Sequence, residues 1–271
     1  MLRSMYSGIG GLRGFQTKLD VIGNNIANVN TTGFKKSRVE FQDILSQTMS
    51  GGSAPGDLGG TNPKQVGLGS AIAAIDVIHT QGGFMTTSVP TDLAIEGNGF
   101  FMVKDATDQV FVTRAGNFSF DRDGNLVNSN GLFVLDSGGA KVTLGTTMDK
   151  IKSYSIGADG KITYTDDAGK TDTTTTGVGI AMVENPAGLE KVGANLYKLT
   201  ASATEDPAAP KWGEANKEAR GAIRAGILEM SNVDLSEEFT EMIVAQRGFQ
   251  ANSRIITTSD SILEELVNLK R

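Results

Sequence analysis

The chain begins with MLRSMYSGIGGLRGFQTKLDVIGNNIANVN, residues 1–30, in which an apolar side chain recurs at every third or fourth position. This spacing is the period of an α-helix and drifts close to a heptad. The apolar stripe includes Leu2, Met5, Ile9, Leu12, Leu19, Ile22 and Ile26. We therefore predict an amphipathic helix over residues 1–30.

The other end of the chain, residues 234–271, repeats this pattern. Asp234 is a suitable N-cap, and Glu237 three residues later is typical of a capping box. The predicted seam consists of Leu235, Phe239, Met242, Gln246, Phe249, Ile256 and Leu263. The net charge is +3 over residues 1–50 and −4 over residues 226–271. Complementary charges beside an apolar seam favour two paired, coiled-coil-like helices, with two separately solvated helices as the alternative.

The middle of the chain has a different pattern of short strands and tight turns. Asp123-Gly124 and Asp159-Gly160 are hairpin turn signals. Strand-like runs cover residues 110–112, 118–120, 132–135, 162–164 and 180–183. We predict a mainly β fold with helical termini: a terminal helical domain (1–30 and 234–271), a connecting segment (31–70) and one central all-β domain (71–233).

Composition excludes several classes of function. The 271 residues include no cysteine and one histidine, so disulfides, thiolate nucleophiles and sulfur-ligated metals are excluded. The net charge of −6 argues against a nucleic-acid partner. No apolar run approaches 18 residues, and the start lacks the apolar core of a cleaved secretory signal. We expect no membrane insertion.

Local motifs do not point to an enzyme. Residues 121–125, DRDGN, lack the glycine position and the bidentate glutamate of a calcium loop, and Gly169-Lys170-Thr171 lacks the earlier glycine of a phosphate loop. His79 has no second histidine with which to bind a metal, so we expect a hydrogen-bonded structural role for it. We expect no catalytic residues, metal or cofactor.

Glycine is frequent in the first predicted helix, at positions 8, 10, 11, 14 and 23. Each glycine costs an exposed helix roughly 1 kcal/mol relative to alanine. Such a helix is predicted to fold on assembly with a partner, where glycine also allows two backbones to approach closely. The alternative is a helix that docks on the β-domain.

Several stretches, in the same order along the chain, resemble the bacterial flagellar rod and hook proteins. They are LDVIGNNIANVNTTGFK (19–35), GNGFF (97–101), TRAGNF (113–118), NPAGLEKVGANLY (185–197), SNVDLS (231–236) and MIVAQR (242–247). The motif residues in the first stretch are Asn24, Asn25, Asn28, Gly33 and Phe34.

The resemblance implies a structural subunit that self-assembles into a hollow tube, with the paired helices inside and the β-domain outside. It implies extracellular localisation, export without a cleaved signal through the flagellar type III apparatus, and contacts with distal rod, hook cap and hook–filament junction proteins. The family also has a short export element, which Phe41 and Leu45 of FQDIL (41–45) fit; ordinary core packing is the alternative.

Within the family, the C-terminal stretches favour a short hook protein, a flexible universal joint. The length of the chain and its glycine-rich segment, about 46–70, favour the rigid distal rod instead. We take the hook as the main expectation and the distal rod as the alternative. An adhesive or carbohydrate-binding module is an alternative of another class, although the chain offers one tryptophan and four tyrosines for an aromatic platform.

Overall fold

The computed structural model describes residues 2–52, 59–204, 211–217 and 220–269. The chain forms two compact units, each built from separate segments. Unit 1 comprises Met1–Ala27, Ser37–Val77 and Asp234–Arg271, and unit 2 comprises Asn28–Lys36 and Ile78–Val233. The backbone therefore passes from one unit to the other four times.

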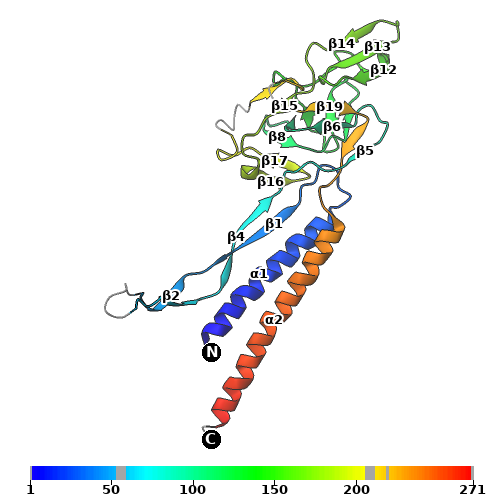
Figure 1. Ribbon diagram of the computed structural model, residues 1–271. Helices are drawn as coiled ribbons and strands as arrows, with labels where there is room; N and C mark the ends of the chain where they lie inside the picture. The colour runs from blue at the N-terminus through cyan, green and yellow to red at the C-terminus, as the bar shows by residue number, and fades with distance from the viewer. Residues whose placement is uncertain (1, 53–58, 205–210, 218–219, 270–271) are drawn as a thin grey trace. The chain divides into compact units, whose positions relative to one another are not determined.

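Two long helices dominate unit 1. Helix α1 spans Leu2–Ala27 and helix α2 spans Leu235–Asn268, and they lie side by side in opposite directions (Figure 1). Asp234 caps α2 by accepting hydrogen bonds from the backbone N–H groups of Ser236 and Glu237, as predicted. The helices are about 39 and 51 Å long from their 26 and 34 residues. Within the described residues, no helix is apolar enough over the required length to span a membrane.

Unit 1 also contains four strands. The antiparallel pair β1 (Ser37–Asp43) and β4 (Ser70–Val77) has a bulge between Glu40 and Phe41. The second pair is β2 (Ser46–Ser50) and β3 (Lys64–Gly67). The structure thus differs from the predicted connecting segment 31–70, because residues 37–77 are paired strands of the helical unit and residues 28–36 belong to the β-rich unit.

Unit 2 is built around a nine-stranded antiparallel sheet with the order β16-β17-β8-β7-β11-β10-β9, in which β15 joins β7 to β18. Its strands are β7 (Phe100–Lys104), β8 (Val110–Thr113), β9 (Phe118–Phe120), β10 (Leu126–Asn128), β11 (Phe133–Val134), β15 (Ile180–Ala181), β16 (Glu190–Gly193), β17 (Leu196–Lys198) and β18 (Trp212–Gly213).

Smaller elements complete unit 2. A three-stranded sheet has the order β12-β13-β14, and β19 pairs with β6 and β20 with β5. The bounds are β5 (Phe84–Thr86), β6 (Leu93–Glu96), β12 (Ile151–Ile156), β13 (Ile162–Asp166), β14 (Thr171–Thr173), β19 (Ala222–Ala225), β20 (Ile227–Glu229), and the 3₁₀ turns η1 (Met148–Lys150) and η2 (Pro186–Gly188).

Unit 2 has one hydrophobic core, in which strand residues from the two sheets and from the β6–β19 pair meet. Phe101 and Phe118 pack edge to face with ring centroids 5.2 Å apart. The predicted turns are present, with φ of +76° at Gly124 and +78° at Gly160. The predicted fold class, mainly β with helical termini, is confirmed.

Candidate assembly surface

Small residues bring α1 and α2 close together. A Cβ on Gly8 would lie 3.5 Å from Cγ1 of Ile256, and one on Gly11 would lie 3.0 Å from the side chain of Asn252. From α2, a Cβ on Gly248 would lie 2.5 Å from Cζ of Phe15. A side chain would be in ordinary contact at Gly8 and tight at Gly11, whereas at Gly248 it would collide with the Phe15 ring, so close packing favours glycine most strongly at Gly248 and offsets its low helix propensity there.

The other side of α1 packs on the β1–β4 pair of the same unit. A Cβ on Gly14 would lie 2.7 Å from Cε1 of Phe41, and one on Gly10 would lie 3.2 Å from the carbonyl oxygen of Ser70. Phe41 and Phe15 have ring centroids 5.8 Å apart. The α1 helix thus packs on both α2 and the β1–β4 pair of its own chain, and its folding on assembly stays a prediction.

Polar contacts fix the register of the two helices. Asn25 is buried, and its side-chain amide accepts from Ser37 N at 3.0 Å while donating to Ser37 O at 2.9 Å and to Glu238 Oε2 at 3.1 Å. Lys18 forms an ion pair with Glu241. Among the described residues, the Lys18–Glu241 ion pair shows the expected charge complementarity, and the Asn25–Glu238 hydrogen bond adds a buried contact between the helices. Asn24, beside Asn25, is exposed.

The row of α2 that faces inward differs from the predicted seam. Its members are Glu238, Ala245, Asn252 and Ser259, spaced by seven residues, of which all but Asn252 are buried and Asn252 lies against Gly11. These are small or polar side chains, so an apolar pattern does not reveal them. Of the predicted seam, Met242, Ile256 and Leu263 are half-buried, whereas Leu235, Phe239, Gln246 and Phe249 are exposed.

More of the predicted α1 seam is covered within the subunit, and its role in assembly stays a prediction. Ile22 is buried, Met5, Leu12, Leu19 and Ile26 are half-buried, and Ile9 is exposed. The side chain of Leu2 lies outside the described residues. The apolar stripe of α1 does not coincide with the side of the helix that faces α2, because glycines, not large apolar residues, occupy that side.

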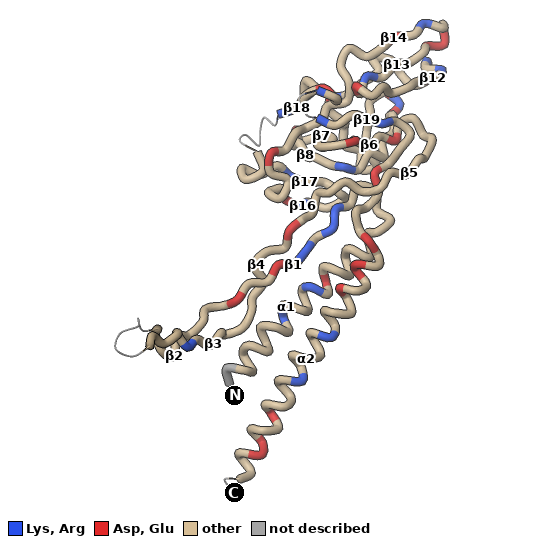
Figure 2. The backbone as a smooth tube through the Cα atoms, in the orientation of Figure 1, with Lys and Arg blue, Asp and Glu red and all other residues tan. Residues whose placement is uncertain are grey.

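Exposed apolar side chains form two strips along α2, which we call the outer strips. At helical spacing, the first consists of Leu235, Phe239 and Ile243, and the second of Val244, Ile255, Ile262 and Leu266. Phe239 and Ile243 are 51% and 59% exposed. Figure 2 shows that the acidic residues of α2 lie toward its two ends, with the basic residues between them. Apolar strips on this scale are typical of an interaction surface.

The end of α2 extends past the start of α1. Because the helices are antiparallel and Gly8 lies against Ile256, the residues after Leu263 reach beyond Leu2 (Figure 1). This segment includes Leu266, Val267 and Leu269, which are exposed. The described part of unit 1 thus presents apolar helix surface suited to another helix.

The two residues of the predicted export element have different surroundings. Phe41 lies against α1, as described above, whereas Leu45 is 81% exposed. Met49 on β2 and Val66 on β3 are also exposed. A two-stranded ribbon is marginally stable by itself in water, so β2–β3 is a second surface suited to a partner.

A cluster of buried charges lies within unit 2. Lys35 and Arg114 belong to two of the stretches that carry the family resemblance, whereas Glu229 lies in none of them. Glu229 on β20 is fully buried and accepts from Lys35 Nζ at 2.5 Å and from Arg114 Nη1 at 3.3 Å. Burial lowers the pKa of Lys35 and of Arg114, and in each case the charge of Glu229 opposes this shift. The available signal was a glutamate inside the apolar run ILEM (227–230).

His79 lies beside this cluster. Its ring makes edge contacts with Phe100 and Tyr197, with centroids 5.6 and 5.4 Å apart. Neither ring nitrogen makes a hydrogen bond of good geometry among the described residues, although the backbone of Pro186 acts on the ring as a weak hydrogen-bond partner. Burial, followed by the charges of Lys35, Arg114 and Lys191, lowers the pKa of His79 to about 4. The ring is therefore neutral at pH 7.

The remaining motif residues organise the segment 28–36 within unit 2. Gly33 has φ of +69°, and its N–H donates to the carbonyl oxygen of Glu229 at 2.8 Å. Phe34 is buried, with Lys191 Nζ 4.9 Å from its ring centroid. Asn28 Oδ1 accepts from the hydroxyl of Thr31 at 3.1 Å.

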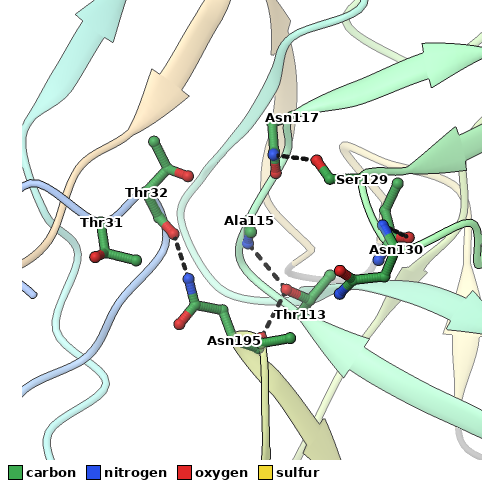
Figure 3. Close-up of a pocket in the computed structure, with 10 residues that line it drawn as sticks. Thr31, Thr32, Thr113, Ala115, Asn117, Ser129, Asn130 and Asn195 are labelled. Atoms are coloured by element: carbon green, nitrogen blue, oxygen red, sulfur yellow. Dashed lines mark hydrogen bonds between the residues drawn. The ribbon is translucent and has the colours of Figure 1, made fainter.

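A pocket of about 260 Å³ opens where three of the stretches that carry the resemblance meet. Figure 3 shows Asn195 donating to Thr32 O at 2.9 Å and Thr113 donating to Asn195 O at 2.8 Å. The pocket is lined by Thr31, Thr32, Thr113, Ala115, Asn117, Asn128, Ser129, Asn130, Ala194 and Asn195. None of these is charged or aromatic, so the pocket offers no stacking platform for a sugar.

The described residues contain no group of three or more histidine, aspartate or glutamate side chains that could hold a metal ion. What the geometry offers is apolar helix and ribbon surface in unit 1 and a rigid, internally bonded unit 2. This arrangement suits assembly better than chemistry.

Comparison with known proteins identifies the family. A protein of Bacillus subtilis (strain 168) named "Flagellar basal-body rod protein FlgG" is 54% identical over 272 residues, covering all of both chains. The chain belongs to the flagellar rod and hook protein family. Three family models match parts of the chain. Residues 5–35 match the model described as "Flagella basal body rod protein", and residues 94–164 match the model described as "Flagellar hook protein FlgE/F/G D1 domain". Residues 224–269 match the model described as "Flagellar basal body rod FlgEFG protein C-terminal".

Other relatives carry both names found in this family. "Flagellar hook protein FlgE" of Borreliella burgdorferi is 32% identical over 446 aligned positions, and that of Treponema pallidum is 54% identical over 136 residues, 49% of this chain and 29% of that protein. Flagellar rod and hook proteins are structural components of polymeric axial assemblies. The comparison therefore confirms the resemblance and the prediction that this chain is not an enzyme.

Proposed function

We propose that this chain is a subunit of the distal rod, the rigid shaft, which was the alternative to the hook in the sequence-based expectation. The observation that carries the proposal is the 54% identity over the whole of both chains to a protein named for the basal-body rod. Of the two hook-named relatives, that of Borreliella burgdorferi matches at a lower identity, 32%, and that of Treponema pallidum matches only 49% of this chain.

The β2–β3 ribbon supports the rigid alternative. Every described residue of these two strands is exposed, including Met49 at 72%. Apolar side chains on a bare ribbon are stabilised when a neighbouring subunit covers them. A contact of this kind on every subunit, in addition to helix packing through the outer strips, restricts sliding between neighbours and so stiffens a tube.

Deletion of the gene tests the assignment. We expect electron micrographs of purified basal bodies to show rods that stop short of their full length, with no hook. Complete rods that lack only the curved extension would instead assign the chain to the hook. Complementation with the unchanged gene is the control.

We propose further that the subunit is exported through the flagellar type III apparatus and that Leu45 belongs to the export element. Phe41 cannot test this alone, because its ring lies against α1. Leu45 is exposed, so L45A removes an element side chain without removing packing inside the subunit. We expect L45A to lower the amount of subunit in the culture supernatant, with V66A, an exposed apolar position on the ribbon, as the control. Equal secretion of L45A and V66A would contradict the export role.

A further inference from the structure

Four peptide bonds connect unit 2 to unit 1. At three of them, the segments on the unit 2 side are hydrogen-bonded to one another. The links are Ala27–Asn28, Lys36–Ser37, Val77–Ile78 and Val233–Asp234. The backbone N–H of Ile78 donates to the carbonyl oxygen of Lys36 at 2.9 Å, which joins two of these exits directly.

One side-chain amide connects these two exits to the third. Asn232, one residue before Val233, accepts from Lys36 N at 2.8 Å through Oδ1. Its Nδ2 donates to the carbonyl oxygen of Ile78 at 2.8 Å and lies 2.9 Å from the hydroxyl of Thr80. Each group of the amide therefore contacts a different exit segment.

The buried charge cluster supports the same three segments from inside unit 2. Lys35 Nζ donates to Thr80 O at 2.8 Å as well as to Glu229. Glu229 also accepts from Gly82 N at 3.0 Å. A residue from each exit segment thus takes part in a charge-assisted network whose centre, the Lys35–Glu229 pair, is excluded from water, where hydrogen bonds are strong.

We propose that Asn232, backed by the Lys35–Glu229 pair, is a mechanical clamp that joins three exits of unit 2 so that they resist force together. This inference rests on the proposed function, since only a torque-bearing subunit loads these links. Hydrogen bonds that break one after another resist less force than bonds that must break at once. An amide shared by three chain segments makes their opening a single event.

Amide hydrogen exchange on the full chain tests the shared opening. We expect N232A to raise exchange at the Lys36 and Ile78 amides together, at least tenfold, with the Leu135 and Gly179 amides of the central sheet unchanged. N232D keeps an acceptor for Lys36 N and loses the donor contacts to Ile78 and Thr80, so we expect the two amides to rise together in this variant also, by less than in N232A. The control is N185A, which removes another asparagine that donates to a backbone carbonyl, Ser202 O at 3.2 Å.

Two results would overturn the clamp. A rise at Lys36 alone in N232A would show that the exits open independently. A uniform rise across unit 2 would make Asn232 a general stability residue.

The mechanical role is tested in cells whose only copy of the gene carries N232A. We expect normal swimming in buffer and at least twofold slower swimming than N185A cells in a medium of high viscosity. The ratio of N232A to N185A swimming speed could instead be the same at all viscosities while the exchange pattern is as expected. This result would show that the clamp carries no force and would overturn the proposal. Failure of the distal rod assignment would appear separately, as complete rods in the deletion strain.

Discussion

Gly33 combines two constraints that few residues can meet. Its φ is +69°, and a Cβ there would lie 2.5 Å from the backbone nitrogen of Ala115. Gly131 has a similar φ of +79°, but a Cβ on it would meet no described atom within 4 Å, so it isolates the effect of backbone strain.

We expect G131A to lower the free energy of unfolding of unit 2 by about 1 kcal/mol from strain. G33A adds a collision with backbone and is expected to lower it by roughly 2–5 kcal/mol. Urea unfolding followed by tryptophan fluorescence measures both. Equal effects of the two variants would show that the segment 28–36 moves away from Ala115 without cost.

His79 makes unit 2 sensitive to mild acid. Its pKa is about 4 in the folded protein, against an ordinary value of 6.5. The unfolded chain therefore binds a proton that the folded chain does not, and the free energy of unfolding falls as pH falls from about 6.5 to about 4. Because the chain has one histidine, His79 dominates the pH dependence of the free energy of unfolding in the upper part of that range.

We expect H79F, which keeps an aromatic ring against Phe100 and Tyr197, to remove most of the loss of stability between pH 7 and pH 5.5. Urea midpoints at these two pH values measure it. H79Q, which cannot titrate but is polar, is the control and should be insensitive to pH while less stable throughout. A pH dependence that persists in H79F would place the titrating group elsewhere.

The outer strips are exposed apolar surface on helix α2. Phe239 and Ile243 are more than half exposed within the subunit, so their loss should largely spare the monomer. We expect the double change F239S/I243S to raise the protein concentration needed for polymerisation at least tenfold, with the unfolding midpoint unchanged. Each buried side chain of this size contributes about 1.5–3 kcal/mol, and every subunit of a polymer repeats the loss.

Sedimentation of assembled protein measures that concentration, and Q250S on the same helix is the matched polar control. Normal polymerisation of F239S/I243S would show that this strip faces solvent in the assembly. A lower unfolding midpoint would show instead that the strip packs inside the subunit.

The sequence predicts the two helices, but not which side of α2 meets α1. Apolar spacing favoured Leu235, Phe239 and Gln246, whereas the buried row includes Ala245 and Ser259. Glycines on α1 require small partners, so the closest contact has the weakest hydrophobic signal. The pairing of Glu229 with Lys35 was beyond prediction for another reason. The two residues are 194 positions apart, and spacing along a chain carries no information about such pairs.

On the scale of the whole molecule, the boundary of the β-rich unit decides which fragment is stable. The predicted domain, 71–233, contains Glu229 but not Lys35, so a fragment with these ends leaves the buried carboxylate with Arg114 as its charged partner and loses the closer pair with Lys35. Breaking a buried pair by removing one partner costs about 3–5 kcal/mol. Segment 28–36 is therefore an integral part of this unit.

We expect a fragment in which Lys36 is joined to Ile78 by a short glycine linker, and which ends at Val233, to unfold cooperatively. The 2.9 Å hydrogen bond between these two residues shows that a short linker suffices. It should be more stable to urea than the fragment 78–233, and K35M in the joined fragment should remove most of the gain. Equal midpoints for the two fragments would show that segment 28–36 is dispensable.

The division of unit 1 among three segments has a consequence for the order in which the molecule takes shape. The helix–helix ion pair joins residues 223 positions apart, whereas six of the twelve strand pairs in the described part of unit 2 join consecutive strands. Folding rates fall as the mean sequence separation of contacts rises. A chain that emerges N-terminus first, from a ribosome or a narrow conduit, must therefore hold α1 without its helical partner until α2 follows, and unit 2 matures before unit 1 closes.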